Sequence, residues 1–182
     1  MYLIGDIGNS EIKMSIVNSK KRIIKKINFS SNNISLINIK KEFKTFYKYF
    51  SKIEKILFCS VVPNSFILIK KFLKTKTNVK CYEIKELNLT SLIKIKVNYN
   101  QVGSDRVTNA ISLIDNKKNF IIIDLGTATT FDVLIKKETR KSFKVIITGG
   151  FSSLFKNPIK TKVVKDEDIT LKGLIKILEL IK

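Results

Sequence analysis

The chain has 182 residues, 44% of them hydrophobic and 27% charged, which is enough to bury a core and excludes a disordered chain. The net charge is +20 and there is no histidine, which excludes a histidine metal site and a histidine-based catalytic triad. The basic excess is nearly all lysine, spread along the chain, whereas nucleic-acid readers concentrate arginine. A nucleic-acid-binding module therefore stays only a minor alternative, and we expect attraction of small anions such as nucleoside triphosphates.

The first part of the chain is expected to alternate strands and helices after an opening meander. Residues 2–5 form a short apolar run, and alternating apolar residues at 12–16 and 23–29 predict two further strands of an antiparallel meander. Apolar residues at helical spacing and short apolar runs then predict a helix, a strand, a helix and a strand, at 35–50, 56–62, 65–73 and 79–84. This order indicates an α/β layer fold.

The second part begins with a loop at 98–103 and a helix at 105–114, for which Ser104 is the expected N-cap. Three strands are predicted next, and the chain ends with a loop around Pro158 and a helix. The strands are expected at 120–123, 131–135 and 143–147, and the helix at 170–181.

One pattern occurs twice. The segments YLIGDIGNSEIKMSIV and FIIIDLGTATTFDVLI both read as an apolar strand, Asp-x-Gly, hydroxyl or amide residues, and a second strand. We interpret this as a diverged internal duplication that divides the chain near residue 104, into 1–103 and 104–182.

The two Asp-x-Gly turns have the chemistry of a phosphate site. Glycine lets a phosphate approach the backbone, and successive backbone N–H groups in such turns bind anions. Lys13 adds a positive charge, Thr127 adds a hydroxyl donor, and the carboxylates of Asp6 and Asp124 suit a hard cation that travels with ATP. The alternative is a pair of ordinary surface turns, which the repetition disfavours.

Asp105 lies at the start of a predicted helix, beside Arg106. The helix dipole and the arginine are expected to keep its carboxylate ionised, so that it can act as a general base toward a hydroxyl. The residues alone favour a plainer interpretation, in which this charge only complements the helix dipole.

The two cysteines, Cys59 and Cys81, lie in apolar stretches without a CxxC spacing, which predicts buried thiols in a reducing compartment. The N-terminus enters a strand pattern at once, so we expect no cleavable signal, and no apolar run is long enough to span a bilayer. These features predict a cytoplasmic protein with no membrane partner.

Taken in order, six motifs make the chain resemble type III pantothenate kinases, a family of the actin/Hsc70/sugar-kinase superfamily. The two most specific are DLGTATTFD and VGSDR. The motifs are DIGNSEIK at 6–13, SVVP at 60–63, VGSDR at 102–106 followed by Asn109-Ala110, DLGTATTFD at 124–132, TGG at 148–150 and DITLKGL at 168–174. The resemblance implies two ribonuclease-H-like halves with mixed sheets flanked by helices.

The resemblance also implies an activity, ATP-dependent phosphorylation of pantothenate in the first step of coenzyme A biosynthesis, by a homodimer that uses Mg²⁺ and K⁺ or NH₄⁺. Asp105 would be the catalytic base, and Asp124 would hold the monovalent cation. Pantothenate would contact Gly103, Ser104, Asp105, Arg106 and Tyr99. ATP would contact Asp6, Ile7, Gly8, Asn9, Ser10, Glu11, Ile12, Lys13 and Thr127.

The chain departs from the family pattern in three places. The long segment between the second hairpin and the TGG turn is reduced to residues 136–142, so the second half is expected to be shortened there. A family tyrosine nine residues before the base is Lys96 here, with Tyr99 nearby but not at the matching spacing, and Ser10 replaces a threonine. These departures leave open an alternative, a non-catalytic descendant that keeps the fold or ATP binding only.

Overall fold

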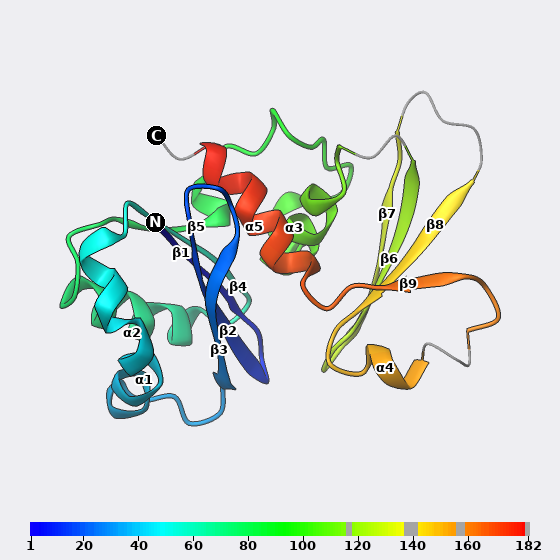
Figure 1. Cartoon of the computed structure of the whole chain (residues 1–182). Coiled ribbons are helices and arrows are strands. Elements are labelled where there is room, and N and C mark those ends of the chain that lie inside the picture. Colours follow the sequence, from blue (N-terminus) through cyan, green and yellow to red (C-terminus); the bar gives the residue numbers. More distant parts are fainter. Residues whose placement is uncertain (116–117, 137–141, 156–158, 181–182) are drawn as a thin grey trace.

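A computed structural model describes residues 1–115, 118–136, 142–155 and 159–180. It contains two β-sheets with helices α3 and α5 between them (Figure 1). The predicted loop at Pro158 and most of the shortened segment fall outside the described residues.

The first sheet has five strands in the order β3-β2-β1-β4-β5. The predicted meander is confirmed, since β1, β2 and β3 are antiparallel neighbours, while β4 and β5 add in parallel. The last strand is shorter than predicted, because only three residues pair with β4. The strands are β1 Tyr2–Ile7, β2 Glu11–Val17, β3 Ile23–Ser30, β4 Lys55–Ser60 and β5 Cys81–Glu83.

The second sheet repeats the arrangement of the first. Its order is β7-β6-β8-β9, with an antiparallel hairpin, β6 and β7, followed by two strands added in parallel. The strands are β6 Asn119–Leu125, β7 Thr129–Leu134, β8 Phe143–Thr148 and β9 Val163–Lys165. The repeat seen in the sequence thus corresponds to a repeat in topology, while the boundary near residue 104 stays a prediction.

One face of the first sheet is covered by α1 (Leu36–Glu42), the 3-10 helix η1 (Phe43–Lys52) and α2 (Pro63–Lys74). A single helix over 35–50 is therefore wrong in its second half, where the backbone tightens. The tighter turns bring Phe43 against other rings, 5.6 Å from Phe46 and 5.2 Å from Phe72 between ring centroids.

The opposite face is covered by α3 (Ser104–Ser112) and α5 (Ile169–Ile177), whose apolar residues share a core with β1 and β4. The two helices pack closely at Gly173, where a Cβ would lie 2.1 Å from the carbonyl oxygen of Thr108. The last helix ends earlier than predicted and continues as the 3-10 helix η4 (Leu178–Leu180).

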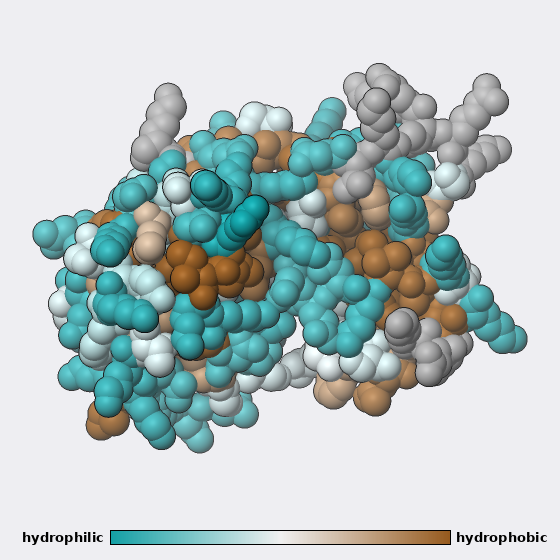
Figure 2. Space-filling view, in the orientation of Figure 1, coloured by the Kyte–Doolittle hydropathy of each residue, from teal (hydrophilic) through white to brown (hydrophobic). Residues whose placement is uncertain are grey.

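The second sheet has a small core on one face, built from Phe120, Ile122 and neighbouring residues. The other face leaves Phe131 and Val133 63% and 60% exposed. Figure 2 shows hydrophobic residues gathered over this sheet, near the short helix α4 (Ser152–Phe155).

Both cysteines are buried and free, as predicted. Among the described helices, none has the length and apolar character needed to cross a membrane.

Candidate active site

The first Asp-x-Gly turn, called the first phosphate turn after its predicted ligand, joins β1 to β2. The N–H of Gly8 donates to the carbonyl of Glu11 (3.0 Å), which closes the turn. Ser31, just after β3, supports it from the neighbouring strand: its hydroxyl donates to the Gly8 carbonyl (2.5 Å) and its N–H to the Ser10 carbonyl (3.0 Å). The turn is thus held on both sides while Asn9 and Ser10 remain exposed.

The predicted ATP residues divide into two groups. The side chains of Ile7 and Ile12 are fully buried in the core, so only their backbone atoms are available to a ligand. Lys13 lies opposite Asp6 in the β1–β2 register, and its Nζ is 3.7 Å from a carboxylate oxygen of Glu11. A lysine with one distant partner can turn toward a phosphate at little cost.

The second phosphate turn follows β6 and is backed by the turn that follows β8. Gly149 has a φ of +87°, and a Cβ there would lie 2.4 Å from a carboxylate oxygen of Asp124. Both the conformation and the close approach require glycine. The turn at Gly149 therefore packs directly against Asp124.

The two phosphate turns meet. The hydroxyls of Ser10 and Thr127 are hydrogen-bonded at 2.8 Å, although the residues lie 117 positions apart. The fold thus brings together the two turns that the repeated sequence pattern predicted.

Helix α3 begins beside these turns, but its start differs from the prediction. Gly103 is the N-cap and Ser104 is already helical. Ser104 is therefore the first residue of the helix, and its hydroxyl donates to Glu83, with its Oγ 2.6 Å from Oε1.

Two side chains of α3 contact the second hairpin. The Arg106 guanidinium binds Asp132 of β7 through Nε (2.9 Å) and Nη2 (2.7 Å). The buried Asn109 donates from Nδ2 to Asp124 (3.3 Å) and accepts at Oδ1 from the Thr170 hydroxyl of α5 (2.8 Å). The positions of Arg106 and Asp124 are therefore set by side chains that the sequence analysis did not assign.

The carboxylates of Asp6, Asp105 and Asp124 lie close enough to repel one another. Burial raises the pKa of Asp6 to about 7; Lys13 opposes this, while Asp105 and Asp124 add to it. Burial also raises the pKa of Asp124, with a further contribution from Asp105, against a lowering by Asn109. Three acids gathered at one place without a bound cation disfavour their own ionisation.

The expectation for Asp105 is corrected. Burial raises its pKa above the usual value and outweighs the hydrogen bond from the Arg106 N–H, while Asp132 raises it further. The Arg106 charge also lowers this pKa, but by less than burial raises it, and the guanidinium is bound to Asp132. A carboxylate with a raised pKa is a stronger base once ionised.

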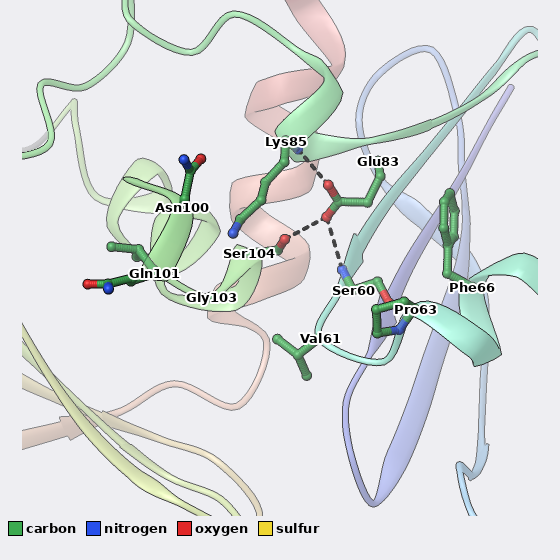
Figure 3. Close-up of a pocket in the computed structure, with 11 residues that line it drawn as sticks. Ser60, Val61, Pro63, Phe66, Glu83, Lys85, Asn100, Gln101, Gly103 and Ser104 are labelled. Carbon is green, nitrogen blue, oxygen red and sulfur yellow. Dashed lines mark hydrogen bonds between the residues drawn. The ribbon is translucent and has the colours of Figure 1, made fainter. Parts of the chain in front are cut away.

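A pocket of about 410 Å³ opens beside the start of α3 (Figure 3). Its wall combines apolar side chains from the β4–α2 junction with polar side chains of the segment before α3. Tyr99, in the 3-10 helix η3 (Tyr99–Gln101), lines a separate cavity of about 480 Å³, so its contact with a substrate stays a prediction. The first pocket is lined by Ser60, Val61, Pro63, Phe66, Glu83, Lys85, Asn100, Gln101, Val102, Gly103 and Ser104.

The donor set fits a cation that is shared with a phosphate. Among the described residues, no three acidic or cysteine side chains form a ready set of metal ligands. Mg²⁺ is commonly held by one or two carboxylates together with substrate phosphates, which suits Asp6 and Asp124. Thr130 lies opposite Asp124 in the β6–β7 register, and its buried hydroxyl has no hydrogen-bond partner within the described part of the chain.

Four contributors to the site were missed: Glu83, Asn109, Asp132 and Thr170. Asp132 and Thr170 stand inside quoted motifs and Asn109 follows one closely, and this position is the signal that could have indicated them. Glu83 had no such signal, because its partners at Ser60 and Ser104 are distant in sequence.

Two repeated sheets whose Asp-x-Gly turns face each other define the actin-like sugar-kinase fold. Two solved structures share this fold at low identity. One is an inorganic polyphosphate/ATP-glucomannokinase from Arthrobacter sp. strain KM (TM-score 0.54, 11% identity, 98% of this chain and 97% of that chain). The other is the ethanolamine utilization protein EutJ from Carboxydothermus hydrogenoformans (TM-score 0.51, 9% identity, 98% and 89%).

The chain belongs to the type III pantothenate kinase family, whose model matches residues 2–154. It is 44% identical to the type III pantothenate kinase of Pelagibacter ubique (strain HTCC1062), in an alignment over 255 residues that covers 100% of each protein. It is 30% identical to relatives of that description from Thermosipho africanus (strain TCF52B) and Francisella tularensis subsp. tularensis (strain SCHU S4 / Schu 4). The matched regions span 66% and 55% of those two relatives, and 91% and 75% of this chain.

Proposed function

We propose that the protein transfers the γ-phosphoryl group of ATP to the 4′-hydroxyl of pantothenate, giving 4′-phosphopantothenate and ADP, the first step of coenzyme A biosynthesis. One observation carries this proposal: α3 places Asp105 within electrostatic reach of the acids of both phosphate turns, with a 410 Å³ pocket at its own N-terminal turn. Membership of the family supports the choice of acceptor.

Different residues of the site are proposed to bind ATP and to accept the proton. Turn amides, the hydroxyls of Ser10 and Thr127, and Lys13 bind the phosphates of ATP. Asp105 accepts the proton of the acceptor hydroxyl, whose oxygen forms a bond to the γ-phosphorus as the bond to the ADP oxygen breaks. Because phosphoryl transfer depends on positioning and charge neutralisation, no covalent role for the protein is needed.

Cations complete the charge balance. Asp6 and Asp124 would hold Mg²⁺ together with the phosphates, and this cation supplies neutralisation of the charge on the transferred group. We assign a monovalent cation, K⁺ or NH₄⁺, to Asp124, and the unpartnered Thr130 hydroxyl supports an oxygen-ligated site there.

The second half is proposed to be shortened relative to the family. The alignment with the Pelagibacter ubique relative is 255 positions long, whereas this chain has 182 residues and is covered completely. Some positions of the relative therefore have no counterpart in this chain. The open apolar face of the second sheet, with Phe131 and Val133 exposed, supports the same proposal, because a sheet face of this kind is normally covered.

We also propose a homodimer that uses this face. A charge of +20 on each chain opposes association, so a contact between two copies requires an uncharged surface, which the side chains of Phe131, Val133 and Phe143 provide. Changing Phe131 and Val133 to Ser and Thr is expected to shift light scattering from the dimer mass to the monomer mass. A dimer that persists in this variant contradicts the proposed interface.

The activity is tested by coupled ADP release with ATP, Mg²⁺ and K⁺, with and without pantothenate. Asp105→Asn is expected to lower kcat by about 100-fold or more while ATP binding is retained. In wild type, ionisation of Asp105 is required for activity, so the acid limb of kcat/KM lies above the usual aspartate range, because its pKa is raised. Folded wild-type protein that releases no pantothenate-dependent ADP contradicts the proposed function.

A further inference from the structure

Glu83 is the last residue of β5, and its carboxylate points toward the start of α3 (Figure 3). It accepts three hydrogen bonds: from the Ser104 hydroxyl (2.6 Å), from the Lys85 N–H (2.7 Å) and from the Ser60 N–H (3.3 Å). The three donors come from different elements, namely the first turn of α3, the 3-10 helix η2 (Ile84–Glu86) and the end of β4. One carboxylate therefore ties the edge of the first sheet to the helix that carries the base.

We infer that Glu83 is a positioning residue for phosphoryl transfer, which holds Asp105 in place through Ser104. This inference rests on the proposed function. Glu83 is hydrogen-bonded to Ser104 and not to Asp105 itself, so its proposed effect on catalysis is indirect.

The start of α3 needs an outside support. Its N-cap is Gly103, which has no side chain to accept a hydrogen bond from the exposed N–H groups of the first turn. Glu83 supplies a negative charge at this positive end of the helix and fixes the hydroxyl of its first residue. The helix start is thus anchored from β5.

Asp105 is sensitive to any movement of this turn. Its Oδ1 lies 2.3 Å from the position that a Cβ on Gly103 would occupy, and accepts a hydrogen bond from the Arg106 N–H at 2.8 Å. The carboxylate is folded back against its own turn, so its direction follows the backbone of residues 103–106. A displacement of about 1 Å at such a group can lower a rate by about 100-fold.

Glu83 also forms part of the wall of the 410 Å³ pocket, together with Lys85 and Asn100. Figure 3 shows Lys85 and Asn100 on the side of the pocket opposite the β4–α2 junction, with the Glu83 network between them. Loss of the Glu83 carboxylate is therefore expected to make both the pocket wall and the Asp105 side chain less rigidly held. The phosphate turns are held by other residues, Ser31 among them, so nucleotide binding is expected to be independent of Glu83.

The experiment compares Glu83→Ala, Ser104→Ala and the double variant with wild type and with a matched control, Glu86→Ala. Glu86 lies three residues away, and its ion pair with Lys70 is long, 3.6 Å. We expect Glu83→Ala to lower kcat/KM for pantothenate by about 100-fold with KM for ATP unchanged. Ser104→Ala is expected to cause a smaller loss, and Glu86→Ala none.

The double variant separates positioning from general structural damage. If Glu83 acts through Ser104, the double variant is no worse than Glu83→Ala, whereas independent effects multiply. Glu83→Gln, which keeps one acceptor oxygen for Ser104, is expected to restore most of the pantothenate-side loss. Equal losses toward ATP and pantothenate, multiplicative losses, or wild-type kinetics in Glu83→Ala each overturn the inference.

Pantothenate binding, measured by calorimetry on all six proteins, separates this inference from the proposed function. If the wild-type protein binds pantothenate but does not phosphorylate it, only the proposed activity is contradicted. The role of Glu83 in shaping the pocket is then tested by whether its variants bind pantothenate more weakly than wild type. Wild-type protein that neither binds nor phosphorylates pantothenate overturns both. If Glu83→Ala does not fold, Ser104→Ala and Glu83→Gln decide the question, because each removes only part of the network.

Discussion

The hydroxyls of Ser10 and Thr127 donate and accept across the two phosphate turns at 2.8 Å, and this bond joins the first sheet to the second. A nucleotide that enters between the turns competes for both hydroxyls. The bond therefore fixes the separation of the two turns, and phosphates that bind through both hydroxyls replace it.

Removal of these hydroxyls is predicted to weaken ATP binding. Thr127→Val and Ser10→Ala are each expected to raise KM for ATP by about 5-fold, since one hydrogen bond contributes about 1 kcal/mol. The double variant is expected to lose more than the product, because breaking the shared bond is a cost of ATP binding that each single change already removes. Steady-state kinetics with ATP varied checks this, and an unchanged KM in both single variants contradicts it.

The stability of the ligand-free protein is predicted to fall as pH rises. Because folding raises the pKa of Asp6 from 3.8 to about 7, the folded protein keeps a proton that the unfolded chain has lost. The resulting stabilisation is complete below about pH 4 and is lost as pH rises through about 7. In the mutant Asp6→Asn the amide mimics the protonated acid throughout this range.

The measurement is the difference in Tm between Asp6→Asn and wild type from pH 4 to 8.5, because this difference removes the effect of the other acids. We expect it to increase in favour of the variant as pH rises, while the variant loses phosphotransfer. A difference that is constant with pH contradicts a raised pKa for Asp6.

Two adjacent glycines make a matched pair. Gly149 has a positive φ and no room for a Cβ beside Asp124, whereas a Cβ on Gly150 meets nothing within 4 Å. Gly149→Ala is predicted to destabilise the protein by about 1–3 kcal/mol and to impair catalysis by displacing Asp124. Gly150→Ala is expected to change the free energy of unfolding by less than about 0.5 kcal/mol. Urea unfolding checks both, and equal effects contradict the structural reason.

The buried Thr170–Asn109–Asp124 chain leads to a prediction about the monovalent cation. Asn109 lowers the pKa of Asp124, so Asn109→Ala is expected to raise this pKa and reduce the affinity for K⁺. Thr170→Val leaves the Asn109 carbonyl without its donor. We expect it to reduce the affinity for K⁺ as well, by about 10-fold or less. Activity titrated against K⁺ measures this. An unchanged half-saturating K⁺ concentration in Asn109→Ala contradicts the role assigned to Asn109.

Sequence patterns predicted the strands and the two phosphate turns well, because both depend on local alternation, glycine and turn chemistry. They failed where tertiary contacts decide the outcome. The 3-10 geometry after Phe43 follows from packing against Phe72, and the true role of Ser104 depends on Glu83, 21 residues earlier. The expectation that the helix dipole and Arg106 hold the pKa of Asp105 low was wrong, because the burial that raises this pKa is a property of the folded site.

Helix α3 packs on the first sheet, yet its Arg106 is bound to a strand of the second. A change in the angle between the two sheets would therefore pull on α3 through Arg106, which is next to Asp105. A nucleotide that enters between the two turns and changes this angle would also move Asp105, which favours an ordered sequence of binding. ATP would then enter first and pantothenate second, and the base would meet a hydroxyl only when a phosphoryl donor is in place.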